Sequence, residues 1–564
     1  MSSHRSPAEV RSSVKHPIID ADGHWIEYNP VFAERMREVA GDKAADGFIA
    51  SQRRIPDALK LSIDERKQRG IAMEGYWSRQ STNTRDRATA MMPRMLYDRL
   101  DELGIDFGVI YPTAGLGIPR IADDETRRAV IRGFNIVTAE YFAKLSDRLT
   151  PAAVIPMWTP EEAIEELEFC TKQLGTKVGM FGGGFARRIP VGKDLDPALG
   201  RFAVTYENLG IDSAYDYDAV WQKCRELQMA PTFHAGGRGF GLRNSPSNFT
   251  FNHIGHFAAA GHSIAKGLFL GGVTRRFPDM NFAFLEGGVG WGCQLFADLI
   301  EHWERRGAKG IAYMDPKKLD RKMLRSLVDK YGYEEMAAEL DKRDGWPSAE
   351  EDNLTGGMPV LDDFAACKIS RKEDWVDLYA RPYYFGCEAD DRMNVTAFGK
   401  ANPFGARINA IFSSDIGHFD VPDMLSPVPE AHELVEDELI TPDDFRDFTF
   451  TNAVRLWGQQ NPRFFEGTVV AKEAAAVLNV APARRLSSRP VLQQRLAVGL
   501  QPRPRHVHRP VAQPLRQRPE TPAVVEMHEM GNLVRHQVVQ HLGRRERQAP
   551  GKGQTAVRSA ASPA

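Results

Sequence analysis

The sequence predicts an α/β fold, a (β/α)8 barrel in which eight parallel strands are surrounded by helices. Short apolar runs alternate with helical patterns about eight times, which indicates a mostly parallel sheet. No Gly-x-Gly-x-x-Gly follows the first run, which disfavours the alternative, an open doubly wound sheet. The 564 residues exceed the roughly 250 that such a barrel typically needs, and the surplus falls in two insertions and a tail.

The predicted strands are short apolar runs, and the first, within 17–27, opens with the β-branched residues of a buried strand. The others follow at 106–113, 149–157, 178–181, 230–234, 281–286, 383–387 and 408–415. The helix after the third strand starts most clearly, because Thr159 is a good N-cap, Pro160 occupies the first helical position and acids fill the first turn. Further helices are predicted at about 124–145, 218–227, 255–269, 291–306, 429–439 and 441–456.

Two helical insertions are expected, after strand one at about 32–99 and between strands six and seven at about 307–382. The barrel domain with its insertions covers 17–480 and follows a disordered N-terminus, 1–16. The tail, 481–564, has no Asp, a single Lys and many Arg, Gln, Pro and Val residues, which predicts disorder. It is either a basic interaction tail or a non-native extension such as a shifted reading frame, and the abrupt change in composition favours the second.

The composition is that of a globular protein, with 42% hydrophobic and 26% charged residues. A formal net charge of −2 gives no field that would favour nucleic acid or an anionic membrane. The first residues lack the apolar segment of a signal peptide, and no run is long enough to span a bilayer. Five scattered cysteines without a Cys-x-x-Cys pair argue against a zinc–thiolate site or a disulfide scaffold, and they favour the reducing cytoplasm.

Asp22 and His24 lie two residues apart at the end of the first strand. Side chains at i and i+2 of a strand point to the same face, so this pair can reach one divalent metal ion. A hydrogen-bonded turn is the commoner role of Asp-x-His. The metal interpretation gains support because His234, Glu286 and Asp415 recur at the ends of strands five, six and eight, where a (β/α)8 barrel gathers its catalytic residues. Each alone has a simpler explanation, as a structural histidine, a helix-capping acid or a turn residue.

Six segments carry a resemblance to a known family. They are 19–24 (IDADGH), 233–236 (FHAG), 269–278 (FLGGVTRRFP), 285–291 (LEGGVGW), 413–415 (SSD) and 452–458 (NAVRLWG). Between about 17 and 470 the chain resembles the amidohydrolase-related group of TIM-barrel metal-dependent enzymes. That group includes aminocarboxymuconate-semialdehyde decarboxylase and γ-resorcylate decarboxylase. The segments are specific for the superfamily and nearly silent on the substrate.

The resemblance implies four ligands of one divalent metal ion. They are Asp22, His24, His234 and Asp415. Oxygen and nitrogen ligands fit zinc or manganese, and the two acids favour manganese. The first-strand pair of the family is usually His-x-His, or has an acid in the first place. Many members have a catalytic histidine after strand six, where this chain has Glu286.

Proton transfer is therefore assigned to Glu286 or Asp415 as candidates. His256, at a helix start after strand five, is a candidate pocket residue, with a helix N-cap as the alternative. Glu27 is either an extra metal ligand or a group that supports one. His418, three residues after Asp415, is a weaker candidate for such support.

These residues predict a metal-dependent enzyme acting on a small organic molecule. The first hypothesis is a hydrolase in which metal-activated water attacks an amide, ester or lactone. The alternative is a non-oxidative decarboxylase of an aromatic or unsaturated acid, placed second because Glu286 replaces the family's histidine. A third hypothesis is a barrel without catalysis that serves as a binding scaffold. The resemblance also implies a homo-oligomer, most simply a dimer.

Overall fold

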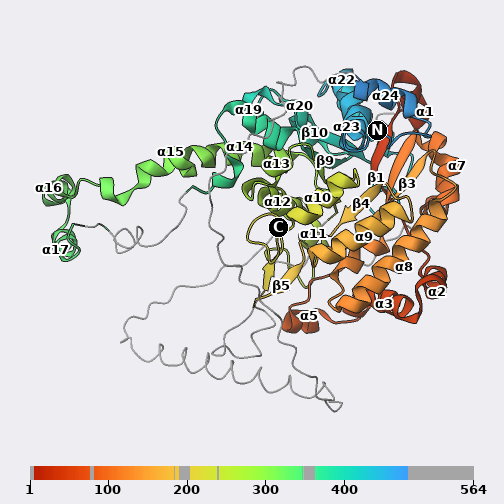
Figure 1. The fold of residues 1–564 in the computed structure, drawn as a ribbon, viewed down its shortest axis with the longest axis horizontal. Helices are drawn as coiled ribbons and strands as arrows, with labels where there is room; N and C mark the ends of the chain where they lie inside the picture. The colour runs from red at the N-terminus through yellow and green to blue at the C-terminus, as the bar shows by residue number, and fades with distance from the viewer. Residues whose placement is uncertain are drawn as a thin grey trace, which may run out of the picture. The chain divides into compact units, whose positions relative to one another are not determined.

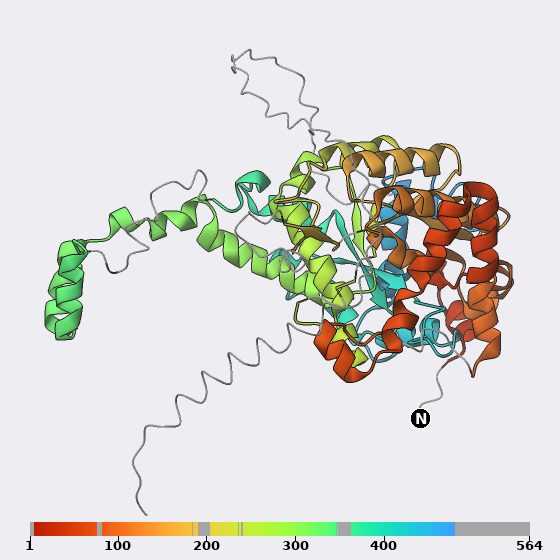
Figure 2. The ribbon, with the colours of Figure 1, turned by 90° about the horizontal axis from the view of Figure 1, so that it is seen from below.

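Eight parallel strands form one sheet with helices outside it in the computed structural model (Figures 1 and 2). The structure describes residues 5–75, 82–182, 184–189, 204–234, 236–237, 241–345, 347 and 362–479. The strands are β1 (Ile19–Trp25), β2 (Phe107–Pro112), β3 (Leu149–Ile155), β4 (Val178–Phe181), β7 (Pro231–Phe233), β8 (Phe282–Phe284), β9 (Tyr383–Glu388) and β10 (Asn409–Ser413). They pair in this order, so the predicted (β/α)8 barrel and its eight strands are confirmed.

The first and last strands meet at a seam of backbone hydrogen bonds. The Asp415 N–H donates to the Asp22 carbonyl at 3.1 Å, and the His24 N–H donates to the Ile416 carbonyl at 2.9 Å. These bonds join the end of β1 to the residues that follow β10. The seam therefore closes the barrel at the level where the predicted metal ligands lie.

A buried carboxylate stabilises the same seam from the preceding part of β1. Asp20, only 1% exposed, accepts hydrogen bonds from the Ser414 backbone N–H at 2.9 Å and from the Ser414 hydroxyl at 2.5 Å. Burial raises the pKa of Asp20 to about 6, against the lowering effect of these hydrogen bonds. A Cβ at Gly23 would lie 2.5 Å from Asp20 Oδ2, so only glycine leaves room for this carboxylate. A β-bulge between Asp20 and Gly23 shifts the pairing with β2.

Helices connect successive strands, as predicted. Those nearest the predicted ranges are α8 (Asp124–Phe142), α9 (Pro160–Lys172), α10 (Asp218–Glu226), α12 (His256–Leu270), α14 (Gly290–Arg306), α21 (Pro427–Glu436), α22 (Pro442–Arg446), the π-helical turn η8 (Asp447–Thr451) and α23 (Asn452–Gly458). Thr159 caps α9 in a capping box with Glu162, and Pro160 is the first helical residue. The last helix of the described residues, α24 (Ala471–Asn479), packs against α23.

Both insertions are helical. The first contains α2 (Asn29–Ala40), α3 (Asp42–Gln52), α4 (Arg54–Leu59), α5 (Ile63–Arg69), α6 (Thr84–Met91) and α7 (Pro93–Leu103). Phe32 of α2 packs on Phe134 of α8 with ring centroids 4.8 Å apart, so this insertion covers the outside of a barrel helix. The second contains α15 (Ala308–Ile311), α16 (Arg321–Tyr331), α17 (Glu334–Lys342) and α19 (Lys372–Trp375). Three further short helices are α11 (Phe249–His253), α13 (Val273–Arg276) and α20 (Val395–Phe398).

The structure differs from the predictions at two places. The stretch 1–16, expected to be disordered, contains α1 (Pro7–Ser13), because Ser6 and Glu9 form a capping box and Val10 is fully buried. A hairpin of β5 (Ala186–Arg188) and β6 (Val204–Tyr206) was not predicted, since its three-residue strands are too short to show alternation. The tail, 481–564, lies outside the described residues. None of the helices in the described ranges combines the length and apolar character that a membrane crossing requires.

Removing the seam carboxylate is expected to destabilise the barrel. Asp20→Ala leaves two buried donors of Ser414 without an acceptor and should lower the free energy of unfolding by about 2 kcal/mol or more. Ser414→Ala should lower it by less, and the double variant should show a coupling energy of about 1–2 kcal/mol in urea unfolding. Strictly additive effects would mean that the two side chains do not act together in the folded protein.

Candidate metal centre

The four predicted ligands come from three places around the barrel, all at carboxyl ends of strands. Asp22 and His24 lie in the C-terminal half of β1, His234 directly follows β7, and Asp415 lies two residues after β10. Glu286 lies two residues after β8. In a parallel barrel these strand ends share one rim, which is why residues hundreds of positions apart meet there.

The imidazole nitrogen His24 Nε2 is the centre of the cluster. It lies 3.1 Å from His234 Nε2, 3.4 Å from Asp22 Oδ1 and 3.6 Å from Asp415 Oδ1. Asp22 Oδ1 is also 3.7 Å from His234 Nε2. Ligand atoms that share an ion at about 2.0–2.2 Å lie roughly 3.0–3.6 Å from one another. The spacings among Asp22, His24 and His234 therefore fit a single divalent ion, and Asp415 lies at this distance from His24.

The hydrogen bonding of Asp22 supports the same interpretation. Its side chain is 1% exposed, yet neither carboxylate oxygen accepts a hydrogen bond from a described residue. A buried carboxylate without donors is costly unless a cation compensates it. The residues present therefore fit a divalent metal ion.

The pKa shifts follow from burial and from the gathering of acids. Burial raises the pKa of Asp22 well above its usual range, and the charge of Glu286 adds to this against the opposing effect of His234. Burial, then Glu286 and Asp420, raise the pKa of Asp415 in the same way. Burial lowers the pKa of His24, which keeps its imidazole neutral, the form that binds metals.

Glu286 and Asp415 share an uncommon backbone conformation. Their φ angles are +56° and +49°, in the left-handed region that residues other than glycine rarely adopt. The Glu286 carboxylate lies 3.0 Å from His234 Nε2. Strained residues of this kind cluster at functional sites, where neighbouring contacts hold them in place.

His418 belongs to the cluster, although the sequence made it only a weak candidate. Its Nδ1 is 2.7 Å from Asp415 Oδ1, its Nε2 is 3.1 Å from Thr113 Oγ1, and its ring stacks on His24 with centroids 4.0 Å apart. Burial lowers the pKa of His418 to about 4. Two overlapping sets of candidate ligand atoms result among the described residues. One is Asp22, His24 and His234, and the other is His24, Glu286, Asp415 and His418.

His256 and Glu27 lie beside these sets and belong to neither. His256 starts α12, whose N-cap is Gly255 without a side-chain bond, so the N-cap alternative for His256 is wrong. A Cβ on Gly236 would come within 2.8 Å of the His256 ring, which places His256 behind the loop that follows His234. Glu27 accepts a hydrogen bond from the Ala114 N–H at 2.8 Å, which ties the end of β1 to the 3-10 helix η1 (Ala114–Arg120).

Sequence reasoning missed three acidic or imidazole groups near Glu286. His253 and Asp420 form a third set of candidate ligand atoms with Glu286. Glu388 ends β9, and burial together with the charges of Glu286 and Asp420 raises its pKa to about 8. Glu388 had a usable signal, because it directly follows the seventh predicted strand. His253 ends the short helix α11 and Asp420 lies in a loop, and for neither does the sequence position indicate the direction of the side chain.

A small cavity of about 20 Å³ opens beside His234. Its lining residues are Leu116, Pro119, Arg120, Met180, Gly182, Phe185 and His234. Arg120 donates a hydrogen bond to the Gly236 carbonyl at 2.7 Å, so a cationic side chain is fixed next to the cluster. A larger cavity of about 320 Å³, lined by residues such as Tyr215 and Arg276, contains none of the predicted site residues.

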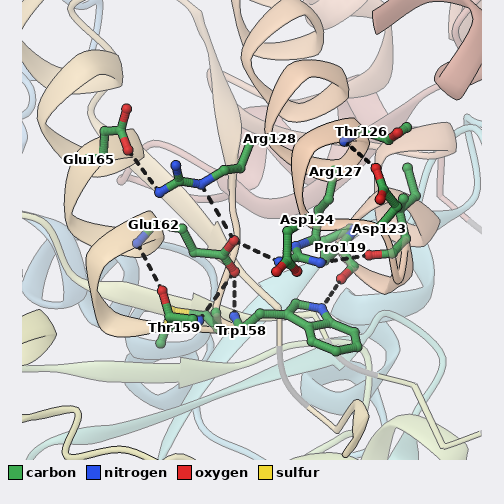
Figure 3. A network of polar contacts seen from close by, with 12 residues as sticks. Pro119, Asp123, Asp124, Thr126, Arg127, Arg128, Trp158, Thr159, Glu162 and Glu165 are labelled. Carbon is green, nitrogen blue, oxygen red and sulfur yellow. Dashed lines mark hydrogen bonds and ion pairs between the residues drawn. The ribbon is translucent and has the colours of Figure 1, made fainter. Parts of the chain in front are cut away.

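A polar network includes Pro119, one of the residues that line the small cavity (Figure 3). Arg127, fully buried, pairs with Glu162 at 2.9 Å and donates to the Ile121 carbonyl at 2.9 Å. Trp158 donates its indole N–H to the Pro119 carbonyl at 2.7 Å. The network therefore fixes the backbone at Pro119 and Ile121, the two neighbours of Arg120.

No family model matches the sequence, and no curated protein matches it either. Several solved structures are similar in fold. An amidohydrolase from Mycobacterium avium subsp. paratuberculosis K-10 is 14% identical, with 79% of this chain and 100% of that chain covered and a TM-score of 0.43. A 2,6-dihydroxybenzoate decarboxylase from Rhizobium is 16% identical, with 78% and 98% covered and a TM-score of 0.40. A dihydroxybenzoic acid decarboxylase from Polaromonas sp. JS666, with bound manganese and 2-nitroresorcinol, is 16% identical, with 80% and 99% covered and a TM-score of 0.43.

At these identities and TM-scores, the case for a function depends on the geometry of the site itself.

Metal binding is the first testable consequence of this geometry. Chelator-treated protein titrated with Mn²⁺ or Zn²⁺ in a calorimeter should bind about one ion per chain, and the ion should raise the melting temperature. Asp22→Asn should weaken binding by at least ~100-fold, because even losing a group behind a ligand costs 10- to 100-fold. Asp437→Asn, an exposed acid paired with Arg392, is the matched control and should bind normally. Unchanged affinity in Asp22→Asn would place any ion elsewhere.

Proposed function

We propose that this barrel is a metal-dependent enzyme that hydrolyses an amide, ester or lactone of a small organic molecule. Asp22, His24, His234 and Asp415 would hold one divalent ion. The observation that carries the proposal is the buried Asp22 carboxylate, without a hydrogen-bond donor, facing two imidazoles at the rim of the barrel. We propose manganese before zinc, because two of the four ligands are carboxylates.

A divalent ion held there would lower the pKa of a water molecule and polarise a substrate carbonyl. The chain's own residues would orient the substrate and move the proton. Asp415 lies 2.7 Å from His418 Nδ1, and His418 is in turn fixed by Thr113. Glu286 lies beside His234 at 3.0 Å. Either Asp415 or Glu286 would take a proton from the attacking water and return it to the leaving group.

The second candidate function is decarboxylation of an aromatic or unsaturated acid. Arg120 favours it, because this guanidinium lines the same cavity as His234 and suits a substrate carboxylate or phenolate. In this reaction Asp415 or Glu286 would instead donate a proton to the carbon that loses CO₂. The third candidate, a binding barrel without catalysis, is favoured only if the well-folded protein takes up no stoichiometric metal.

We also propose a reducing compartment such as the cytoplasm. The five cysteines are all buried and unpaired, and burial raises the pKa of each thiol. Thiols of this kind persist where disulfides are not formed. Their protonated state also argues against a cysteine nucleophile.

Isotope labelling separates the two reactions. Metal-loaded protein is incubated in ¹⁸O-water with two substrate panels, one of esters, amides and lactones and one of hydroxybenzoic acids. Hydrolysis predicts one ¹⁸O atom in the acid product. Release of CO₂ with no label in the remaining product would overturn the hydrolase and establish the decarboxylase.

Glu286→Gln separates proton transfer from metal binding. The substitution keeps the shape of the side chain and removes its basicity, so kcat should fall by about 10²–10⁴-fold while one ion per chain remains bound. Glu301→Gln, an exposed acid on α14, is the control and should behave like the natural protein. A Glu286→Gln variant with full activity would leave Asp415 as the remaining candidate.

A further inference from the structure

The second insertion carries an unusual amount of exposed apolar surface. We define its helical arm as residues 308–342, which run from α15 to α17. Of the 22 large apolar side chains that are exposed among the described residues, eight lie on this arm. They are Tyr313, Met314, Leu319, Met323, Leu327, Tyr331, Tyr333 and Met336. Such a concentration marks an interaction site more often than chance exposure does.

The arm has few buried side chains and therefore only a small hydrophobic core. Helices α16 and α17 lie side by side (Figure 1), and Arg325 joins them through two bonds to Asp341 at 2.7 and 2.9 Å. Within these two helices only Val328 and Leu340 are buried. Helices of this length are marginal in water without packing, so the hairpin requires a further partner.

The exposed side chains form a stripe. Met323, Leu327 and Tyr331 are spaced by four residues along α16 and therefore share one face of that helix. Their exposed fractions are 61%, 47% and 72%. A stripe at this spacing is the form in which one helix packs against another.

We propose that this arm is a dimerisation surface and that its partner is the arm of a second copy of this chain. The charges of the two helices are complementary in the way that a two-fold axis requires. Helix α16 has four basic residues and one acid, whereas α17 has four acids and one basic residue. In an isologous pair, each α16 meets the partner's α17, so both contacts join opposite charges.

The exposed apolar area of the arm and its charges outside ion pairs are both consistent with a second arm as the partner. The eight side chains expose on the order of 1,000 Å², given that a large aromatic buries about 150–250 Å², and a stable interface needs roughly 800 Å² from each partner. Some charges are already used within the chain, such as Arg325 with Asp341 and Arg321 with Asp344. Within α16 and α17, the charged residues that form no ion pair with a described residue are Lys322, Lys330, Glu334 and Glu335.

Mass measurement of the full chain tests the surface. Sedimentation velocity should give twice the 63.1 kDa of one chain for the natural protein. The double variant Met323→Glu with Leu327→Glu should raise the dimer dissociation constant by at least ~10-fold, because it places two charges in the apolar centre of the interface. The control is Leu242→Glu, which places the same charge on a side chain that is 91% exposed outside the arm. Circular dichroism should show the same helix content for all three proteins.

Charge reversal tests the arrangement. One protein carries Lys322→Glu and Lys330→Glu, the other carries Glu334→Lys and Glu335→Lys. Each should dimerise weakly alone, because like charges then face each other across both contacts. A mixture should form heterodimers by native mass spectrometry, since every contact is again between opposite charges. A monomeric natural protein, or a dimer that neither the stripe variant nor charge reversal weakens, would overturn the proposal.

Discussion

The closure of the barrel between β1 and β10 is the constraint on which the rest of the structure depends. Two backbone hydrogen bonds and the Asp20–Ser414 pair bring the end of the last strand against the end of the first. Asp415 reaches His24 only because this seam is closed. The same short stretch of β1 therefore completes the fold and supplies half of the proposed metal ligands.

The site concentrates negative charge in a buried place. The charge of Glu286 raises the pKa values of Asp22, Glu388 and Asp415 across the rim, and burial is the largest cause of each shift. The imidazoles beside them are held neutral by the same burial, so they do not compensate this charge. A divalent ion would compensate the negative charge and also use the neutral imidazoles, because it binds neutral imidazoles and ionised carboxylates.

The sequence predicted most of the architecture, because apolar runs between helical stretches report directly on a buried parallel sheet. It also predicted that side chains from the ends of strands one, five and eight would lie close together, since all carboxyl ends share one rim. It gave His418 too little weight, because the stacking of His418 on His24 depends on the turn after β10. His253 and Arg120 end short helical turns and Asp420 lies in a loop, and the directions of these segments are set by tertiary packing. The sequence did not indicate helix α1, because only two of its side chains, Pro7 and Val10, are buried and the apolar pattern is therefore short.

The central claim is that one ion joins side chains from the first, fifth and eighth strands of the barrel. Anomalous diffraction from crystals grown with Mn²⁺, recorded on both sides of the manganese absorption edge, tests it most directly. The account predicts one strong peak within about 2.0–2.4 Å of His24 Nε2, His234 Nε2 and the carboxylates of Asp22 and Asp415. A crystal in which these four side chains are ordered and no peak lies between them would contradict it.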